Sequence, residues 1–180
     1  MNLIFDFGNS LTKYFFIQDD KVIDRGSFIS NKVDDNMLAI KNKRSIEKLI
    51  YSSVVDDKRD ELSSIFKNSK IISLRDKTIK LPFTNEYKSE TLGDDRVALV
   101  SAGLSLYPNK DLLIIDIGTC ITYDIVTMNK KYLGGSISPG FNLRYSSLSD
   151  RTSNLPKLEF KIPKSLIGDS TEEHIHAGIY

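Results

Sequence analysis

Apolar residues in the first half of the chain form short runs of the kind that build β-strands. The runs at residues 3–5, 14–17 and 22–28 are separated by polar turns, and this pattern predicts three antiparallel strands in a meander. Strand, helix and strand are predicted to follow at residues 49–55, 57–68 and 71–74. The first half therefore has the alternating elements of an α/β layer.

The second half opens with the same order of elements. Three strands are predicted at residues 112–115, 123–126 and 132–137. Helices are predicted at 97–106, after Gly140, and after Ser170, where Ser170 and Glu173 form a capping-box pattern. Two stretches are less regular: residues 31–44 are polar and ambiguous, and residues 76–92 are expected to be a loop that crosses between the halves.

One phrase occurs in both halves, each time directly after an apolar strand. It reads Asp, apolar, Gly, polar, small, apolar, Thr, and its two copies are Asp6-Phe7-Gly8-Asn9-Ser10-Leu11-Thr12 and Asp116-Ile117-Gly118-Thr119-Cys120-Ile121-Thr122. A second strand and a polar turn follow each copy. The repeat predicts two similar half-domains.

The repeated phrase contains the groups that a phosphate-binding turn needs. A carboxylate at a strand end can hold a metal ion, and glycine lets backbone N–H groups approach phosphate oxygens. Asn9, Ser10, Thr12, Thr119 and Thr122 add side-chain donors, and Lys13 is within reach of a phosphate. The alternative is an ordinary hairpin turn, since Gly and Asn are common turn residues. The presence of two copies favours phosphate binding.

The segment Gly93-Asp94-Asp95-Arg96 lies between the halves, at the predicted start of a helix. A carboxylate beside an arginine can accept a proton from a substrate hydroxyl while the guanidinium holds an anionic group. Helix capping is an equally good interpretation, because acidic residues favour the first helical turn. Asp94 is the expected cap, which leaves Asp95 and Arg96 for chemistry.

Composition narrows the class of protein. The chain has 180 residues, 40% of them hydrophobic, and a formal net charge of +1, so neither nucleic acid nor an anionic membrane is an expected partner. Its single cysteine, Cys120, fits a reducing cytosol and predicts a cytoplasmic protein. His174 and His176 are expected to be surface residues, because their spacing places them on different sides of a helix.

These motifs together resemble type III pantothenate kinases. The resemblance rests on Asp6-x-Gly8-Asn9-Ser10-x-x-Lys13, Gly93-x-Asp95-Arg96, Asp116-x-Gly118-Thr119-x-x-Thr122-x-Asp124, Gly134-Gly135-x-Ile137-x-Pro139-Gly140, Leu155-Pro156 and Gly168-x-Ser170-Thr171, in that order. The family belongs to the actin-like ATPase superfamily. The resemblance implies an α/β fold of two duplicated actin-like (ribonuclease H-like) half-domains, with mixed sheets flanked by helices. We expect them at residues 1–92 and 93–180, the second being incomplete.

The resemblance also implies roles for individual residues. Asp95 would be the general base, and Gly93, Asp94, Arg96, Tyr87 and Thr171 would bind pantothenate. The segment Asp6, Phe7, Gly8, Asn9, Ser10, Leu11, Thr12 and Lys13, together with Thr119, would bind ATP. Asp6 would hold Mg²⁺ through the phosphates, and Asp116 would carry a monovalent cation, K⁺ or NH₄⁺.

The reaction implied is ATP-dependent phosphorylation of pantothenate to 4'-phosphopantothenate, the first step of coenzyme A biosynthesis, by a homodimer. Two alternatives share the fold: a non-catalytic nucleotide-binding regulator or scaffold, and a kinase for another small hydroxy substrate. The three carboxylates Asp6, Asp95 and Asp116 argue against the scaffold, because a scaffold needs none of them.

Overall fold

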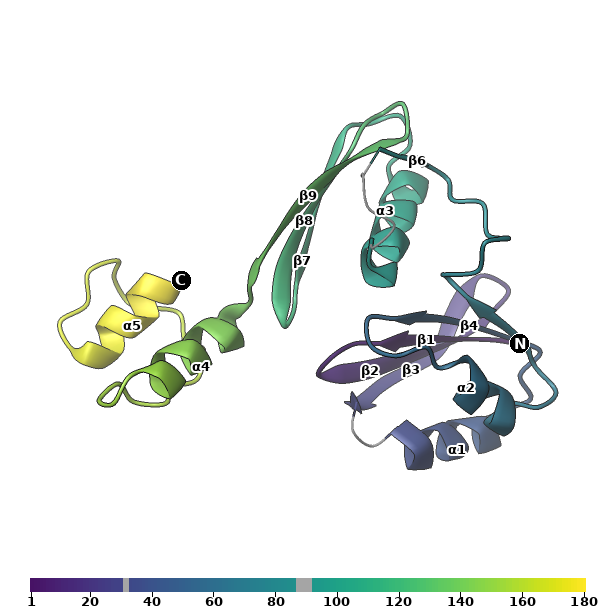
Figure 1. Ribbon diagram of the computed structural model, residues 1–180, viewed down its shortest axis with the longest axis horizontal. Helices are drawn as coiled ribbons and strands as arrows, with labels where there is room; N and C mark the ends of the chain where they lie inside the picture. Colours follow the sequence, from purple (N-terminus) through teal and green to yellow (C-terminus); the bar gives the residue numbers. More distant parts are fainter. Residues whose placement is uncertain (31–32, 87–91) are drawn as a thin grey trace. The chain divides into compact units, whose positions relative to one another are not determined.

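The computed structural model of the protein describes residues 1–30, 33–86 and 92–180 (Figure 1). Contacts divide them into two compact units. The first unit comprises Met1–Asp111 and Val126–Leu133, and the second comprises Leu112–Ile125 and Gly134–Tyr180. The half-domain boundary expected after residue 92 stays a prediction.

The first unit is built on a five-stranded sheet. Its strands are β1 (Asn2–Phe7), β2 (Leu11–Gln18), β3 (Lys21–Ile29), β4 (Lys48–Ser53) and β5 (Lys70–Ser73), in the order β3-β2-β1-β4-β5. The predicted meander is confirmed, because β1, β2 and β3 pair antiparallel. β4 pairs parallel with β1 and with β5, which makes the sheet mixed.

Two helices, α1 (Val33–Lys43) and α2 (Arg59–Ile65), cover one face of this sheet (Figure 1). The alternate residues Leu3, Phe5 and Phe7 of β1 point into the core under these helices. α1 forms in the stretch that was ambiguous in sequence. Met37 and Ile40, spaced one helical turn apart, are both buried in the core, and this packing selects the helix.

A second sheet has the order β6-β9-β8-β7, from β6 (Thr84–Asn85), β7 (Leu112–Ile117), β8 (Cys120–Val126) and β9 (Lys131–Pro139). The segment expected to be a loop thus contributes one short strand, since Thr84 pairs with Lys131. The three remaining helices are α3 (Asp94–Leu106), α4 (Phe141–Arg151) and α5 (Thr171–Ile179), as predicted from the sequence.

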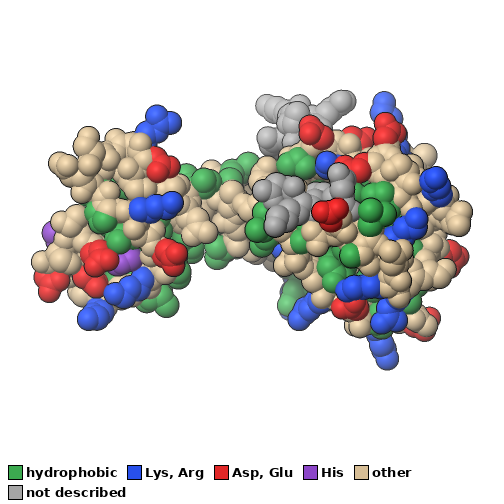
Figure 2. Space-filling view, turned by 90° about the horizontal axis from the view of Figure 1, so that it is seen from below, with side chains coloured by type: hydrophobic (Ala, Val, Ile, Leu, Met, Phe, Trp, Pro, Cys, Tyr) green, Lys and Arg blue, Asp and Glu red, His purple; other side chains and the backbone are tan. Residues whose placement is uncertain are grey.

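The second sheet exposes one row of apolar side chains. Leu113, Ile115 and Ile117 alternate along β7 and are all at least half exposed, and Leu133 and Ile137 of β9 are exposed as well. Figure 2 shows basic and acidic side chains interspersed on the visible face. Among the described helices, none is long and apolar enough to cross a membrane.

Helices α4 and α5 pack around Tyr145, Ile175 and Ile179. The predicted cap is confirmed, because the Ser170 hydroxyl accepts a hydrogen bond of 3.3 Å from the Glu173 amide. The prediction that His176 lies on the surface is wrong. Its ring is buried, with Nδ1 2.6 Å from the Tyr145 hydroxyl, because α5 packs that side against α4.

A buried tyrosine links β4 to the segment before α2. The Tyr51 hydroxyl donates a hydrogen bond to Asp57, and this bond lowers the pKa of the Asp57 carboxyl below its ordinary value. Burial, followed by the same bond, raises the pKa of Tyr51. A carboxyl with a lowered pKa in the folded state stabilises the fold above its unfolded pKa, and this stability is lost as pH falls through the folded pKa.

We therefore expect Tyr51→Phe to lower the free energy of unfolding by about 1 kcal/mol at neutral pH. The difference from the unmodified protein should shrink as pH falls from about 4, the ordinary pKa of an unfolded aspartate, through the lower pKa that Asp57 has in the folded state. Urea unfolding at about pH 7 and about pH 3 measures both values. A difference that stays constant with pH would contradict the assignment of the Tyr51–Asp57 bond.

Candidate functional site

The first copy of the repeated phrase forms the turn between β1 and β2. The Gly8 amide donates to the Leu11 carbonyl at 3.2 Å, and the Ser30 hydroxyl donates to the Gly8 carbonyl at 2.7 Å. Thr12 is fully buried, with its hydroxyl 3.2 Å from that of Ser30. Asn9 is exposed at the tip of the turn. Thr12 therefore holds the turn from beneath, while the tip faces solvent, where a phosphate could bind.

A small pocket of about 280 Å³ adjoins this turn. It is lined by Phe7, Gly8, Asn9, Thr12, Ser30, Val55 and Lys58. Sequence reasoning missed Ser30 and Lys58, because they lie far from the motif in the chain. Lys58 forms an ion pair of 2.9 Å with Glu61. The turn thus has a basic side chain nearby besides Lys13.

Asp6 lies at the end of β1 with one carboxylate oxygen held by the sheet. Oδ1 accepts a hydrogen bond of 2.8 Å from the Ser52 hydroxyl, and Oδ2 lies 3.9 Å from Lys13 Nζ. Both partners sit directly opposite Asp6 on neighbouring strands, Lys13 on β2 and Ser52 on β4. About a third of the Asp6 side chain is exposed, which leaves it accessible to a cation or its waters.

Asp94 begins helix α3, but it is not the cap. Gly93 occupies the N-cap position, and no side chain caps it. Asp94 is buried instead, and its carboxylate accepts hydrogen bonds from the Ser53 amide and from Arg75 Nε, both at 3.2 Å. The expectation that Asp94 caps the helix is therefore wrong. Its side chain turns inward because two donors on neighbouring segments bind it there.

Asp95 and Arg96 complete the first turn of α3. Asp95 is partly buried, and its Oδ1 accepts a hydrogen bond of 2.8 Å from the Arg96 amide. A Cβ on Gly93 would lie 2.5 Å from that oxygen, so a side chain there would displace the Asp95 carboxylate. The Arg96 side chain is buried, so it does not simply extend into solvent.

A pocket of about 580 Å³ opens beside this turn. Its wall combines the apolar residues Leu74, Ile79, Leu81, Leu92 and Val97 with the polar residues Arg75, Asp76, Asn85, Gly93 and Asp94. Apolar walls with a few polar groups are typical of small-molecule sites. Tyr87, expected to bind substrate, lies outside the described residues.

The second copy of the phrase makes a tighter turn between β7 and β8. The Gly118 amide donates to the Cys120 carbonyl at 2.9 Å, one residue earlier than in the first copy. Asp116 and Thr119 are exposed, while Thr122 and Asp124 are buried. The two copies thus share a layout in sequence but differ in the register of the turn.

The position of Gly140 shows why the motif from Gly134 to Gly140 ends in a glycine. Its amide donates to the Thr119 carbonyl at 3.0 Å, and a Cβ on it would lie 2.2 Å from the Gly118 carbonyl oxygen. The chain after β9 can pass the second turn this closely only with glycine at position 140.

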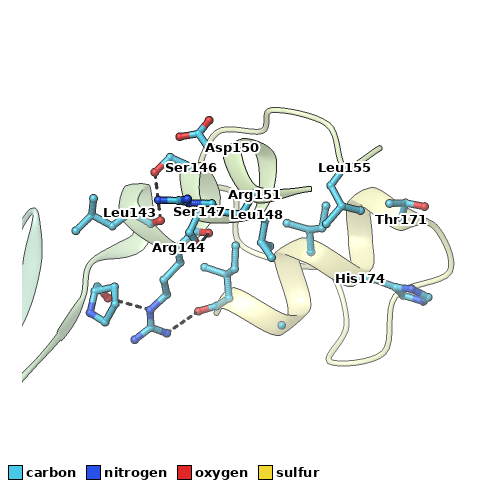
Figure 3. A pocket seen from close by; sticks show the side chains of 14 residues that line it. Leu143, Arg144, Ser146, Ser147, Leu148, Asp150, Arg151, Leu155, Thr171 and His174 are labelled. Carbon is cyan, nitrogen blue, oxygen red and sulfur yellow. Dashed lines mark hydrogen bonds between the residues drawn. The ribbon is translucent and has the colours of Figure 1, made fainter. Parts of the chain in front are cut away.

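Thr171 begins helix α5 in the second unit. It lines a pocket of about 910 Å³ between α4 and α5, together with Leu148, Leu155, His174 and Ile175 among others. Figure 3 shows Thr171 near one end of this pocket and Arg144 near the other, where Arg144 donates to the carbonyls of Pro139 and Ile179.

The structure thus brings part of the predicted site together. Within the first unit, the Asp6–Lys13 turn and the Gly93–Arg96 segment both contact the end of β4, through Ser52 and Ser53. Asp116, Thr119 and Thr171 belong to the second unit. In the described parts of the chain, no group of three or more His, Cys, Asp and Glu side chains could hold a metal ion.

Comparison with known proteins shows which family this sequence matches. The family model for type III pantothenate kinase matches residues 2–180. A type III pantothenate kinase of Christiangramia forsetii is 42% identical over 181 residues, which cover 99% of this chain and 74% of the relative. The enzyme of the same name from Flavobacterium psychrophilum is 37% identical over 184 residues, covering 99% of this chain and 75% of the relative. The chain thus spans about three quarters of each.

Solved structures support the fold. A Campylobacter jejuni protein described as a Baf family transcriptional activator aligns with a TM-score of 0.57 and 24% identity, over 98% of this chain and 72% of the other. A Sinorhizobium meliloti protein described as a 2-dehydro-3-deoxygalactonokinase has a TM-score of 0.52 and 13% identity, over 84% and 57%. The expected mixed α/β architecture, with two sheets and flanking helices, is confirmed.

The two glycines that open the turns provide a matched test. A Cβ on Gly8 would lie 2.8 Å from the Leu11 carbonyl oxygen, whereas a Cβ on Gly118 meets nothing nearer than 3.9 Å. We expect Gly8→Ala to lower the free energy of unfolding by about 1–3 kcal/mol. Gly118→Ala should change it by less than about 0.5 kcal/mol. Urea unfolding measures both, and equal losses would show that the two turns are equivalent after all.

Proposed function

This chain belongs to the type III pantothenate kinase family, and we propose that it transfers the γ-phosphate of ATP to pantothenate with Asp95 as the general base. The product is 4'-phosphopantothenate, and the reaction opens coenzyme A biosynthesis. One observation carries the assignment of the site: the Asp6 turn and the first turn of α3 are both bonded to the end of β4.

The proposed step is an in-line displacement. The primary hydroxyl oxygen of pantothenate forms a bond to the γ-phosphorus, and the bond from this phosphorus to the bridging oxygen of ADP breaks. The hydroxyl proton passes to the Asp95 carboxylate. Phosphoryl transfer depends on positioning and on charge neutralisation. Asp95 suits this role because the Arg96 amide fixes its Oδ1 within a turn that adjoins a pocket.

ATP would be held by the segment from Asp6 to Lys13 and by Thr119. The exposed tip of the Gly8 turn and the pocket lined by Lys58 support phosphate binding there. The residues also fit Mg²⁺, because magnesium in kinases uses one or two carboxylates and the substrate phosphates, and Asp6 is partly exposed. When bound, Mg²⁺ neutralises the charge on the transferred phosphate.

Pantothenate would be held by Gly93, Asp94, Arg96, Tyr87 and Thr171. The pocket beside Gly93 supports this assignment, because its apolar wall suits the branched methyl groups of pantothenate. For Asp94 the geometry favours a structural contribution, since both of its carboxylate oxygens already accept hydrogen bonds from the protein.

The remaining assignments concern the monovalent cation, the assembly and the location. The exposed carboxylate of Asp116 would carry K⁺ or NH₄⁺, for which oxygen ligands are suitable.

A homodimer is supported by the exposed apolar row of β7, which association would bury. A cytoplasmic location, with neither nucleic acid nor membrane as partner, completes the proposal.

Asp95→Asn tests the general base. The substitution keeps the shape of the side chain but removes its proton acceptor, so kcat should fall about 10²- to 10⁴-fold. A coupled ADP-release assay with pantothenate, Mg-ATP and K⁺, on the complete gene product, measures this. The matched control is Asp60→Asn, an exposed aspartate in the first turn of α2, which should keep its activity. Full activity of Asp95→Asn would exclude it as the base, and no pantothenate-dependent ADP release by the unmodified protein would favour another substrate or a scaffold.

Asp116→Asn tests the cation site. If Asp116 holds the monovalent cation, the K⁺ concentration for half-maximal activity should rise about tenfold, because one ligand charge is lost. The titration keeps ionic strength constant with choline chloride, and Asp35→Asn on the exposed face of α1 serves as control. An unchanged K⁺ midpoint in Asp116→Asn would place the cation elsewhere.

A further inference from the structure

Arg75 joins the end of β4 to the first turn of α3, and the proposed reaction needs these two segments at a fixed distance. It follows β5 by two residues, and its guanidinium donates to the Ser53 carbonyl at 2.7 Å and to Asp94 Oδ1 at 3.2 Å. Sequence reasoning gave no signal for it. A lone arginine in a polar loop has no motif that marks it, and its partners lie about twenty residues away on either side.

Ser53, Arg75 and Asp94 form a closed ring of hydrogen bonds. Asp94 accepts from Arg75 through Oδ1 and from the Ser53 amide through Oδ2, while the Ser53 carbonyl accepts from Arg75. We call the three residues Ser53, Arg75 and Asp94 the strand–helix clamp. Asp94 is only 4% exposed, and a carboxylate buried this deeply is costly without its cationic partner. Arg75 is therefore the charge that lets Asp94 remain in place.

The clamp fixes the first turn of α3 to the end of β4, which also supports the Gly8 turn between β1 and β2. We call this second turn, proposed above to bind phosphate, the phosphate turn. Ser53 lies opposite Phe7 in the parallel ladder, and the Val54 amide donates to the Phe7 carbonyl at 3.1 Å. Phe7 directly precedes Gly8. Because Asp95 follows Asp94 in the chain, the clamp sets the place of the Asp95 carboxylate relative to this turn.

We propose that Arg75 is a positioning residue for the kinase reaction. Through its bond to Asp94, it holds the Asp95 carboxylate at the correct distance from the phosphate turn. The proposal rests on the proposed function, because it takes Asp95 as the general base. Phosphoryl transfer is sensitive to such placement, since a displacement of about 1 Å can cost about 10²-fold in rate. In this role Arg75 takes no proton, and its effect on the rate passes through its bond to Asp94.

A neighbouring ion pair supplies a matched control. Arg59 donates to Asp76, the residue next to Arg75, and so ties α2 to the same loop. Both arginines are partly exposed. The Arg59 side chain bonds to Asp76, whereas the Arg75 side chain bonds to Asp94 at the start of α3. Loss of either arginine should therefore loosen the loop, but only loss of Arg75 should loosen α3.

The test compares Arg75→Ala, Arg75→Lys and Arg59→Ala in the complete gene product. We expect Arg75→Ala to lower kcat about 10- to 100-fold while the KM for ATP changes less than about twofold. Arg75→Lys should recover part of kcat, because lysine keeps the charge but cannot reproduce the fork of two donors. Arg59→Ala should keep kcat within about twofold, even where it lowers the free energy of unfolding as much as Arg75→Ala does.

A double-substitution cycle sharpens the test. If Arg75 acts through Asp94, Arg75→Ala combined with Asp94→Ala should lower kcat no further than the more harmful single change. Additive losses would mean that Arg75 acts by another route. A kcat in Arg75→Ala within about twofold of the unmodified protein, or an equal loss in Arg59→Ala, would also overturn the proposal.

Hydrogen exchange separates this proposal from the proposed function. The Val97 amide donates to the Gly93 carbonyl at 3.0 Å in the first turn of α3. Its exchange should accelerate at least about tenfold in Arg75→Ala and stay unchanged in Arg59→Ala. If the unmodified protein fails to phosphorylate pantothenate, the proposed function is wrong, but the exchange rate of the Val97 amide still tests whether Arg75 holds α3 in place. Unchanged exchange in Arg75→Ala overturns the clamp whatever the substrate.

Discussion

The parallel pairing of β1 with β4 is the constraint on which the first unit depends. It places Asp6 opposite Ser52 and Phe7 opposite Ser53, so that two segments distant in sequence end at one edge of the sheet. Ser52 then bonds to the Asp6 carboxylate, and the Ser53 backbone bonds to Asp94 and Arg75. The carboxyl ends of parallel strands are where α/β proteins place their ligands. Here the same edge supports the Gly8 turn and the first turn of α3.

The two copies of the repeated phrase show how far duplication constrains a structure. Both glycine amides donate across their turns, yet the second bond closes one residue earlier. The first turn is supported from below by Ser30 and Thr12, while the second is contacted by Gly140. Equivalent motifs have thus acquired different supports, which is consistent with the different ligands that we propose for Asp6 and Asp116.

An enzyme that works by positioning depends on how rigidly its fold holds the reacting groups. In phosphoryl transfer the protein supplies little covalent chemistry, so the distance between the proposed base and the proposed phosphate-binding turn would strongly affect the rate. The short chain of bonds from the Gly8 turn through β4 to Asp94 keeps this distance fixed within a single compact unit. A buried carboxylate at Asp94 is a costly way to do this, and the two donors that bind it offset the cost.

The sequence by itself determined most of the element order, though not α1 or β6, and it determined the antiparallel meander, the Ser170 cap and the family. Strand alternation, cap chemistry and spaced motifs are local properties of the chain. It left residues 31–44 ambiguous, and it misplaced Asp94 and His176. Only the tertiary structure decided these. α1 is selected by burial of Met37 and Ile40, His176 is buried by the packing of α5 on α4, and Asp94 turns inward because Ser53 and Arg75 meet it there. Such contacts join residues far apart in sequence, and no local pattern encodes them.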